Sequence, residues 1–294
     1  MLARPGLPRF DYVRAETPGQ VVALLAERGE AARLLMGGTD LFPRMREGTA
    51  RPALVIDVKH IPGMQEIAVD GQGWLTVGAA VTMNGLARHP RVRSDYPLLA
   101  EAAGMVASYQ LRNRATVGGN MCNASPCADT TPATMVLEGR FVLVGPGGER
   151  EIAAADFFRG PGLTALQRGE FLRAIRYPPP PQGAVGCYLK LGRNRLGDLA
   201  IVSVAVLGFA DHTASSGYRF RIALGAVAPV VVRAAAAEAL LASEPPGEEA
   251  FARAAEKAVE AASPIDDVRA SAAYRLAMVR ALTLRGLRQV FRGM

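Results

Sequence analysis

The sequence is poor in the side chains that most often carry catalysis or bind metals, with three cysteines and three histidines in 294 residues. Three cysteines are too few for a disulfide scaffold of this length, and their odd number favours reduced thiols in a cytoplasm. The three histidines lie at positions 60, 89 and 212, without the spacing of metal ligands. No residue set therefore predicts a self-contained nucleophilic or acid–base active site.

Long apolar runs and clustered basic residues are also absent. No uncharged apolar stretch reaches the roughly 20 residues that cross a bilayer, and the first ten residues lack the apolar region of a signal peptide. Arginine supplies most of the net charge of +7, but it is scattered and not interleaved with aromatics, so we do not expect nucleic-acid binding. An anionic cofactor or an acidic partner surface would use the same charge. We predict a cytoplasmic protein with no membrane span.

Familiar nucleotide and cluster motifs are incomplete. Three Gly-X-Gly pairs occur, but none completes a dinucleotide fingerprint after a strand, and no phosphate loop is present. Cys122 and Cys127 begin a plant-type iron–sulfur pattern, whose third ligand would fall at Thr130. We therefore interpret both cysteines as small buried thiols and predict no metal site in this chain.

Alternating and helical patterns divide the chain into three predicted units. A helix opening at Thr17-Pro18 with strands at 32–36 and 53–58 forms a small α/β unit, residues 1–58. The second unit, 59–176, is predicted to contain strands at 74–79, 141–144 and 171–177, and helices at 82–89 and 97–105. The run Pro178 to Pro181 predicts a linker, because proline continues neither a helix nor a central strand.

The third predicted unit, 177–294, has strands first and helices afterwards. The strands are predicted at 186–191, 200–209 and 218–226, and the helices at 231–243, 248–262 and 265–292. On the last helix the periodicity predicts one apolar side, formed by Val268, Ala272, Leu276, Val279, Leu287 and Val290. The solvent side is predicted to carry Arg275, Arg285, Arg288 and Arg292.

The first informative motif is a glycine bend after a buried strand, Leu34-Leu35-Met36-Gly37-Gly38-Thr39-Asp40-Leu41. Glycine permits positive φ and leaves its N–H unshielded, so successive amides can form a nest for an anion, to which Thr39 adds a hydroxyl. The alternative is a tight turn between strand and helix with no ligand.

The second motif is a polar stretch of about eighteen residues, predicted to be irregular over 115–131. Gly118-Gly119 is expected to repeat the donor geometry of the first bend, with donors from Thr116 and Asn120 beside it. Asp129 is an acceptor of the kind that binds sugar hydroxyls. Together the two motifs favour a ligand that contains a pyrophosphate.

The pairing of Gly37-Gly38-Thr39-Asp40 with Thr116-Val117-Gly118-Gly119-Asn120 and Asn123-Ala-Ser125-Pro-Cys-Ala-Asp129 resembles the FAD-binding medium subunit of the molybdenum hydroxylases. This family includes carbon monoxide dehydrogenases and xanthine dehydrogenases. A third motif, Tyr188-Leu-Lys190 through Ala200, resembles the start of the family's C-terminal domain.

The resemblance implies an α+β fold of the vanillyl-alcohol-oxidase type. Two subdomains would clasp FAD, followed by a C-terminal domain of three antiparallel strands and helices. It also implies non-covalent FAD, with Leu34 to Leu41 and Thr116 to Asn120 along the diphosphate and ribityl chain. It further implies that Asp129 contacts ribityl or ribose hydroxyls and that Leu172 and Val106 lie near the adenine. Lys190 and Tyr188 would lie near the flavin ring. Ser125 is also implied as a cofactor-binding residue.

The same resemblance implies the partners and the activity. The partners would be a subunit with two [2Fe–2S] clusters and a molybdopterin subunit, in a dimer of heterotrimers. Electrons would pass from the clusters through FAD to an external small-molecule acceptor. Two alternatives stay open: a stand-alone FAD-dependent oxidase or dehydrogenase, and a binding module whose glycine turns hold no cofactor.

Overall fold

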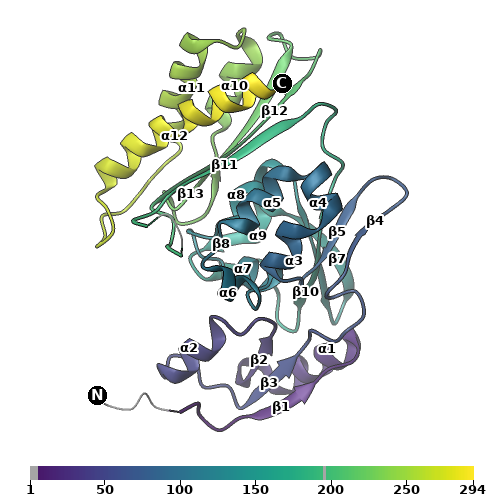
Figure 1. Ribbon diagram of the computed structural model, residues 1–294. Coiled ribbons are helices and arrows are strands. Elements are labelled where there is room, and N and C mark those ends of the chain that lie inside the picture. Colours follow the sequence, from purple (N-terminus) through teal and green to yellow (C-terminus); the bar gives the residue numbers. More distant parts are fainter. Residues whose placement is uncertain (1–5, 195–196) are drawn as a thin grey trace.

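A computed structural model describes residues 6–194 and 197–294 of the chain, and Figure 1 shows three sheet-containing layers stacked one above another. Arg195 and Leu196 of the third motif lie outside the described residues, as do residues 1–5 of the N-terminal segment. Within the described part of the chain, no helix combines the length and the apolar character needed to span a membrane.

The lowest layer in Figure 1 is a parallel sheet in the order β1-β3-β2, formed by Asp11–Arg14, Leu54–Asp57 and Ala32–Leu35. The predicted helix is α1, Pro18–Arg28, and it begins as expected: the Thr17 side chain accepts a hydrogen bond from the Gln20 amide, and proline occupies the first turn. A short helix, α2 (Leu41–Arg46), follows the first glycine bend. A single helical turn, Gly29–Ala31, joins α1 to β2.

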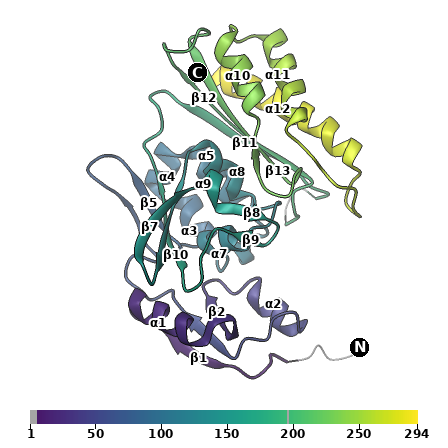
Figure 2. The same cartoon turned by 180° about the vertical axis from the view of Figure 1, so that it is seen from behind.

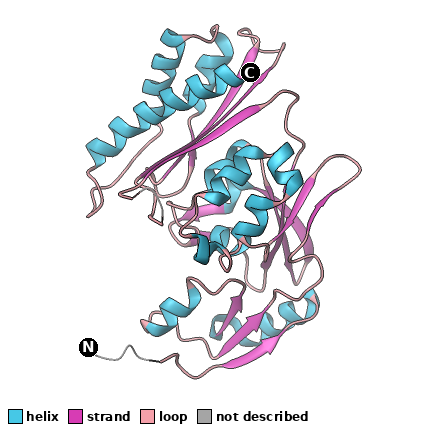
Figure 3. Ribbon diagram, in the orientation of Figure 1, coloured by secondary structure: helices cyan, strands magenta, loops and turns pink. Residues whose placement is uncertain are grey.

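The middle layer is a five-stranded antiparallel sheet in the order β4-β5-β10-β6-β7. Its strands are Ile67–Val69, Leu75–Gly78, Phe171–Tyr177, Arg140–Gly145 and Gly148–Ala153. Short helices cover one side of it (Figure 3): α3 Met83–Arg88, α4 Pro90–Asp95, α5 Pro97–Gly104, α6 Tyr109–Arg112, α7 Val117–Cys122, α8 Thr130–Val136 and α9 Ala154–Phe157. A small hairpin, β8 (Phe158–Gly160) and β9 (Leu163–Thr164), completes the layer.

The upper layer is an antiparallel sheet whose helices lie on one face (Figure 2). The three predicted strands are β11 Val185–Leu191, β12 Val202–Ala210 and β13 Tyr218–Gly225, joined by a two-residue β14, Val232–Arg233. The helices are α10 Ala235–Ser243, α11 Glu248–Glu260 and α12 Ala272–Gly293. The expected linker, Pro178 to Pro181, contains neither helix nor strand.

Strand β12 holds the upper layer together because it is apolar on both faces. Alternate residues of a strand point to opposite sides, so Val202, Val204 and Val206 pack under the C-terminal helices. Ala205 and Leu207 instead join the core of the middle layer, where α5 and α8 lie. The C-terminal sheet is therefore buried on both sides, and its far face presses directly on the middle unit.

Sequence predictions about the helices were wrong in three places, of which two lie before the last helix. The stretch 115–131 is not irregular: it contains α7 and the first residues of α8. Thr116 accepts a hydrogen bond from the Gly119 amide, so a side-chain cap starts α7 despite its two glycines. Helix α10 begins at Ala235, since residues 232–233 pair with β13 as β14.

The last helix begins later than predicted, at Ala272, because Ser271 caps it by accepting from the Tyr274 amide. Val268 therefore precedes the helix and is 99% exposed, although its position in the periodic pattern predicted burial. Arg275 was predicted on the solvent side and is instead 2% exposed. Its guanidinium donates to the carbonyls of Ile201 and Ala226, at 2.8 and 3.0 Å, and to Asp267 at 2.7 Å. These partners explain how a charged residue is accommodated in the core.

Replacement of Arg275 should be costly. Arg275→Ala leaves two carbonyls and a carboxylate without their donor, so we expect a loss of about 3 kcal/mol in the free energy of unfolding. Arg280→Ala is the matched control on the same helix, because Arg280 is exposed and pairs with Glu256; its loss should stay below about 1 kcal/mol. Urea denaturation of both variants measures the difference, and equal losses would contradict the buried role of Arg275.

Candidate functional site

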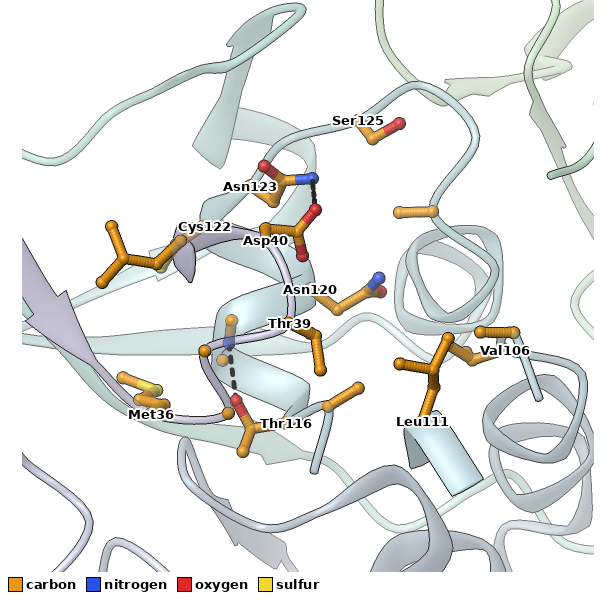
Figure 4. Close-up of a pocket in the computed structure, with 18 of the residues that line it drawn as sticks. Met36, Thr39, Asp40, Val106, Leu111, Thr116, Asn120, Cys122, Asn123 and Ser125 are labelled. Carbon is orange, nitrogen blue, oxygen red and sulfur yellow. Dashed lines mark hydrogen bonds between the residues drawn. The ribbon is translucent and has the colours of Figure 1, made fainter. Parts of the chain in front are cut away.

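A cavity of about 600 Å³ opens where the first and middle units meet (Figure 4). One wall is the glycine bend between β2 and α2. The opposite wall is built from α6, α7 and the loop that follows α7, and residues 197–199 close one end. The lining carries both polar and apolar side chains, which suits a large ligand with charged and aromatic parts.

The first glycine bend turns an unsatisfied row of amides toward this cavity. Among the described residues, the amides of Gly37, Gly38, Thr39 and Asp40 donate to no backbone or side-chain acceptor, and all four residues line the cavity. Gly38 has φ +74°, the left-handed conformation that favours glycine. Gly37, Gly38 and Thr39 are half-buried and Asp40 is exposed, so their amides are accessible to a ligand, and this bend fits one with several anionic oxygens.

Gly37 has a different reason to be glycine. A Cβ at this position would lie 2.2 Å from the carbonyl oxygen of Arg114, in the middle unit. The bend is thus seated directly against the segment that leads into α7. Any side chain at position 37 would push the two walls of the cavity apart.

The second glycine motif does not repeat the donor geometry of the first, and that prediction was wrong. The Gly118 amide donates to the Ala79 carbonyl at 2.8 Å, and the Gly119 amide donates to Thr116 Oγ1 at 3.2 Å. The helix cap therefore consumes the Gly119 donor, and a contact with the residue that follows β5 consumes the Gly118 donor. Gly118 instead permits close packing, since a Cβ there would lie 2.5 Å from Cβ of Ala79.

The side chain of Asn120 supplies the free donor of the second motif. Its Oδ1 accepts a hydrogen bond of 2.6 Å from Thr130 Oγ1, which orients the amide. The Nδ2 group then has no partner among the described residues and lies at the cavity lining.

A polar bridge joins the two walls at one side of the cavity (Figure 4). Asn123, at the end of α7, donates from Nδ2 to Asp40 Oδ1 at 3.5 Å and accepts from Arg44 Nη2 at 2.5 Å. Asp40 and Arg44 are one helical turn apart at the start of α2. The bridge therefore ties the first unit to the middle unit beside the glycine bend.

Asp129 lies at the cavity lining and is fixed from behind by the C-terminal unit. Lys190 Nζ donates to its Oδ2 at 2.9 Å, and Tyr188 Oη donates to its Oδ1 at 2.7 Å. Both partners come from β11, and the Lys190 side chain is 6% exposed. Burial raises the pKa of Asp129, and the attraction of the Lys190 ammonium offsets part of that rise. Burial and the neighbouring carboxylate raise the pKa of Tyr188, so its phenol stays protonated.

The structure brings most of the predicted site residues to one cavity. Those at its lining are Leu34, Met36, Gly37, Gly38, Thr39, Asp40, Leu41, Val106, Thr116, Gly118, Gly119, Asn120, Ser125, Asp129 and Leu172. Four others do not line it: Leu35, Val117, Tyr188 and Lys190. Leu35 points to the other face of its strand and packs with Met45 and Val55, and Val117 lies in the main core.

Sequence reasoning missed several lining residues, among them Arg44, Leu111, Asn123, Phe171 and Leu199. Asn123 lay within a recognised motif and had a signal that could have found it. Arg44 follows Asp40 by four residues, which places the two on one face of a helix that starts at the bend. Leu111 and Leu199 had no such signal.

Cys122 and Cys127 were interpreted as buried thiols, but both are half-buried and line the cavity. All three cysteines are free thiols. Burial raises the pKa of Cys122 and of Cys187 to about 12, so both remain protonated. Within the described residues, no group of three or more His, Cys, Asp or Glu side chains gathers as a metal site would require.

These features suit an extended anionic ligand held between two units that contain helices and strands, and comparison with known proteins shows the family to which the chain belongs. Residues 8–180 match the family model described as the FAD binding domain in molybdopterin dehydrogenase. Residues 187–290 match the model of the CO dehydrogenase flavoprotein C-terminal domain. The chain belongs to the family of FAD-binding medium subunits of molybdenum hydroxylases, which are flavoprotein subunits of oxidoreductases with FAD as cofactor.

Individual relatives agree with the family models along nearly the whole chain. The carbon monoxide dehydrogenase medium chain of Hydrogenophaga pseudoflava is 36% identical, covering 95% of this chain and 96% of the relative. A putative xanthine dehydrogenase FAD-binding subunit of Escherichia coli is 29% identical, with 92% of each chain covered. The solved structure of the Hydrogenophaga pseudoflava carbon monoxide dehydrogenase superposes with a TM-score of 0.93, covering 98% of this chain and 99% of that one. The resemblance and the expected two-part FAD-binding fold with its antiparallel C-terminal domain are confirmed.

A substitution at Gly37 tests the close contact between the two walls of the cavity. In Gly37→Ala, the new methyl must displace the Arg114 carbonyl, and overpacking of this kind costs enough to raise the Kd for FAD at least about tenfold. Gly71→Ala is the control, because a Cβ at that turn meets nothing within 4 Å. Quenching of flavin fluorescence measures both affinities. An unchanged Kd in Gly37→Ala would show that the bend does not hold the ligand.

The Lys190–Asp129 pair predicts a pH-dependent stability. Lys190→Met leaves a buried carboxylate without its cation, so the cofactor-free protein should lose about 3 kcal/mol of stability near neutral pH. Because burial raises the pKa of Asp129 in the folded state, protonation favours folding, and the loss relative to the parent should be smaller at about pH 5 than at about pH 8. Adding Asp129→Asn should recover part of the loss. A loss independent of pH would argue against an unpaired carboxylate as its cause.

Proposed function

We propose that this chain is the electron-transferring FAD subunit of a heteromeric molybdenum hydroxylase, passing electrons from iron–sulfur clusters to an external small-molecule acceptor. The observation that carries the proposal is the row of unpaired amides from Gly37 to Asp40 at the cavity lining. Such a row suits the diphosphate of a dinucleotide. The relatives named above are subunits of multi-component dehydrogenases, which supports partner subunits here.

The residues at the cavity fit FAD without a covalent bond. The amides of the first bend and Thr39 would hold the diphosphate, and the Asn120 side chain would donate to it or to the ribityl chain. Asp129, with its carboxylate oriented by Tyr188 and Lys190, would accept from ribityl or ribose hydroxyls. Val106 and Leu172 would contact the adenine. When bound, the flavin supplies the redox chemistry.

The other residues of the site would position the cofactor and tune its electrostatic environment. Lys190 and Asp129 form a buried pair of opposite charges behind the lining, and we propose that this pair sets the local charge felt by the flavin ring, with Tyr188 beside it. Leu35 and Val117 act indirectly, by packing the two walls. The second glycine motif was predicted to donate hydrogen bonds to the ligand, and the side chains of Thr116 and Asn120 would do so in place of the Gly118 and Gly119 amides.

The assembly and the site of action complete the proposal. We propose partners carrying two [2Fe–2S] clusters and molybdopterin, in a dimer of heterotrimers, working in the cytoplasm where the three free thiols would stay reduced. We also propose that the chain divides into functional units at 1–58, 59–176 and 177–294. The first two would clasp FAD and the third would support them.

Reconstitution of the assembled complex tests the proposal. The isolated chain should bind one equivalent of FAD and stay oxidised when carbon monoxide or xanthine is added, because it has no substrate site. In the complex, removal of FAD should abolish reduction of an external acceptor while the clusters are still reduced by substrate, and added FAD should restore turnover. Absorption of the clusters and the flavin separates these steps.

Two results would contradict this function. Reduction of the flavin in the isolated chain by a small substrate would favour the stand-alone oxidase or dehydrogenase. A purified chain that binds no FAD at micromolar concentration would favour the cofactor-free module.

A further inference from the structure

We propose that Arg269, in the loop before α12, is a positioning residue for the cofactor site and couples FAD binding to the order of the loop 263–271. This inference rests on the proposed function, in which the cavity holds FAD. Arg269 does not line the cavity. It reaches the site through a wall segment, residues 125–129, that does.

The C-terminal unit holds this wall segment at successive points. Arg269 Nη1 donates to Cys127 Sγ at 3.5 Å, and the Ala226 amide donates to the Pro126 carbonyl at 2.8 Å. Asp129, at the end of the segment, receives hydrogen bonds from β11, as described above. Cys127 and Asp129 line the cavity, whereas their partners lie behind them. The wall is therefore part of the middle unit, but its position is determined by contacts from the C-terminal unit.

Arg269 is itself rigidly held. Its Nε and Nη2 both donate to Asp267 Oδ2, at 3.0 and 2.6 Å, and its own amide donates to Asp267 Oδ1 at 2.8 Å. The same carboxylate accepts from the buried Arg275, which in turn donates to the carbonyls of Ile201 and Ala226. These bonds hold the pKa of Asp267 well below its usual range, so the carboxylate stays charged. A guanidinium fixed in this way is already oriented toward Cys127 before a ligand arrives.

Coupling between two sites is reciprocal. If the Arg269 network holds the wall in its binding position, then FAD bound against the wall must stabilise the network in return. Amide hydrogen exchange reports such local stability. The loop 263–271 should therefore exchange more slowly when FAD is bound, although it does not line the cavity.

The experiment uses the full chain with FAD as the added ligand. Arg269→Met removes the donors and keeps much of the side-chain length, and the expected result is a Kd for FAD raised about tenfold. Arg269→Lys keeps a charged donor and should restore part of the affinity. Arg280→Met is the control, since Arg280 is exposed and its ion pair with Glu256 lies between α12 and α11. Exchange of the loop 263–271 is followed with and without FAD in each protein.

FAD should slow exchange in 263–271 of the parent protein and of Arg280→Met, and this effect should be lost in Arg269→Met. The proposal is overturned if FAD slows exchange at the bend 36–41 of the parent but leaves 263–271 unchanged, a result that needs no variant to fold. It is also overturned if Arg269→Met binds FAD as tightly as the parent. If the parent binds no FAD at all, the proposed function fails instead, and the two failures are distinguished.

Discussion

The cavity depends on a close contact between the first and middle units, at a position where only glycine fits. Gly37 brings its backbone against the Arg114 carbonyl, and a single methyl group there would lie 2.2 Å from that oxygen. This contact sets the distance between the row of free amides on one wall and the side chains of α7 on the other. The bridge from Asn123 to Asp40 and Arg44 spans the same junction. In the proposed function, recognition of FAD from two sides would depend on this one close approach.

Charged groups inside the molecule serve mainly to hold backbone in place. Arg275 donates hydrogen bonds to the carbonyls of Ile201 and Ala226 and to Asp267, and so links three segments of the C-terminal unit. Lys190 and Tyr188 orient Asp129 from behind. In both clusters the charge is paired with an opposite charge and hydrogen-bonded to specific atoms, which makes burial tolerable and the geometry specific, although Nε of Arg275 has no partner among the described residues. The third unit therefore supports the site although few of its residues line the cavity.

The sequence predicted the elements well where local signals were strong. Thr17-Pro18 and Thr82 mark helix starts that the structure confirms, and the three long C-terminal strands follow their apolar runs. The sequence-based prediction failed where a helix cap stabilised a helix in a stretch whose composition suggested a loop. The two glycines of α7 suggested a loop, but the Thr116 cap and packing against Ala79 make a helix. For the last helix, periodicity placed Val268 inside and Arg275 outside. The Ser271 cap leaves Val268 before the helix and exposed, and the partners of Arg275 hold that side chain in the core.

By itself the sequence determined which segments are strands and helices, the glycine bend that can present amides, and the motifs that mark the family. These properties are local, because φ preferences, side-chain caps and apolar periodicity act over a few residues. Only the tertiary structure decided which amides stay free. The Gly118 and Gly119 donors are consumed by partners within the middle unit, and the Gly37 to Asp40 donors are not. Whether a polar group is satisfied depends on atoms that are distant along the chain, which no local pattern contains.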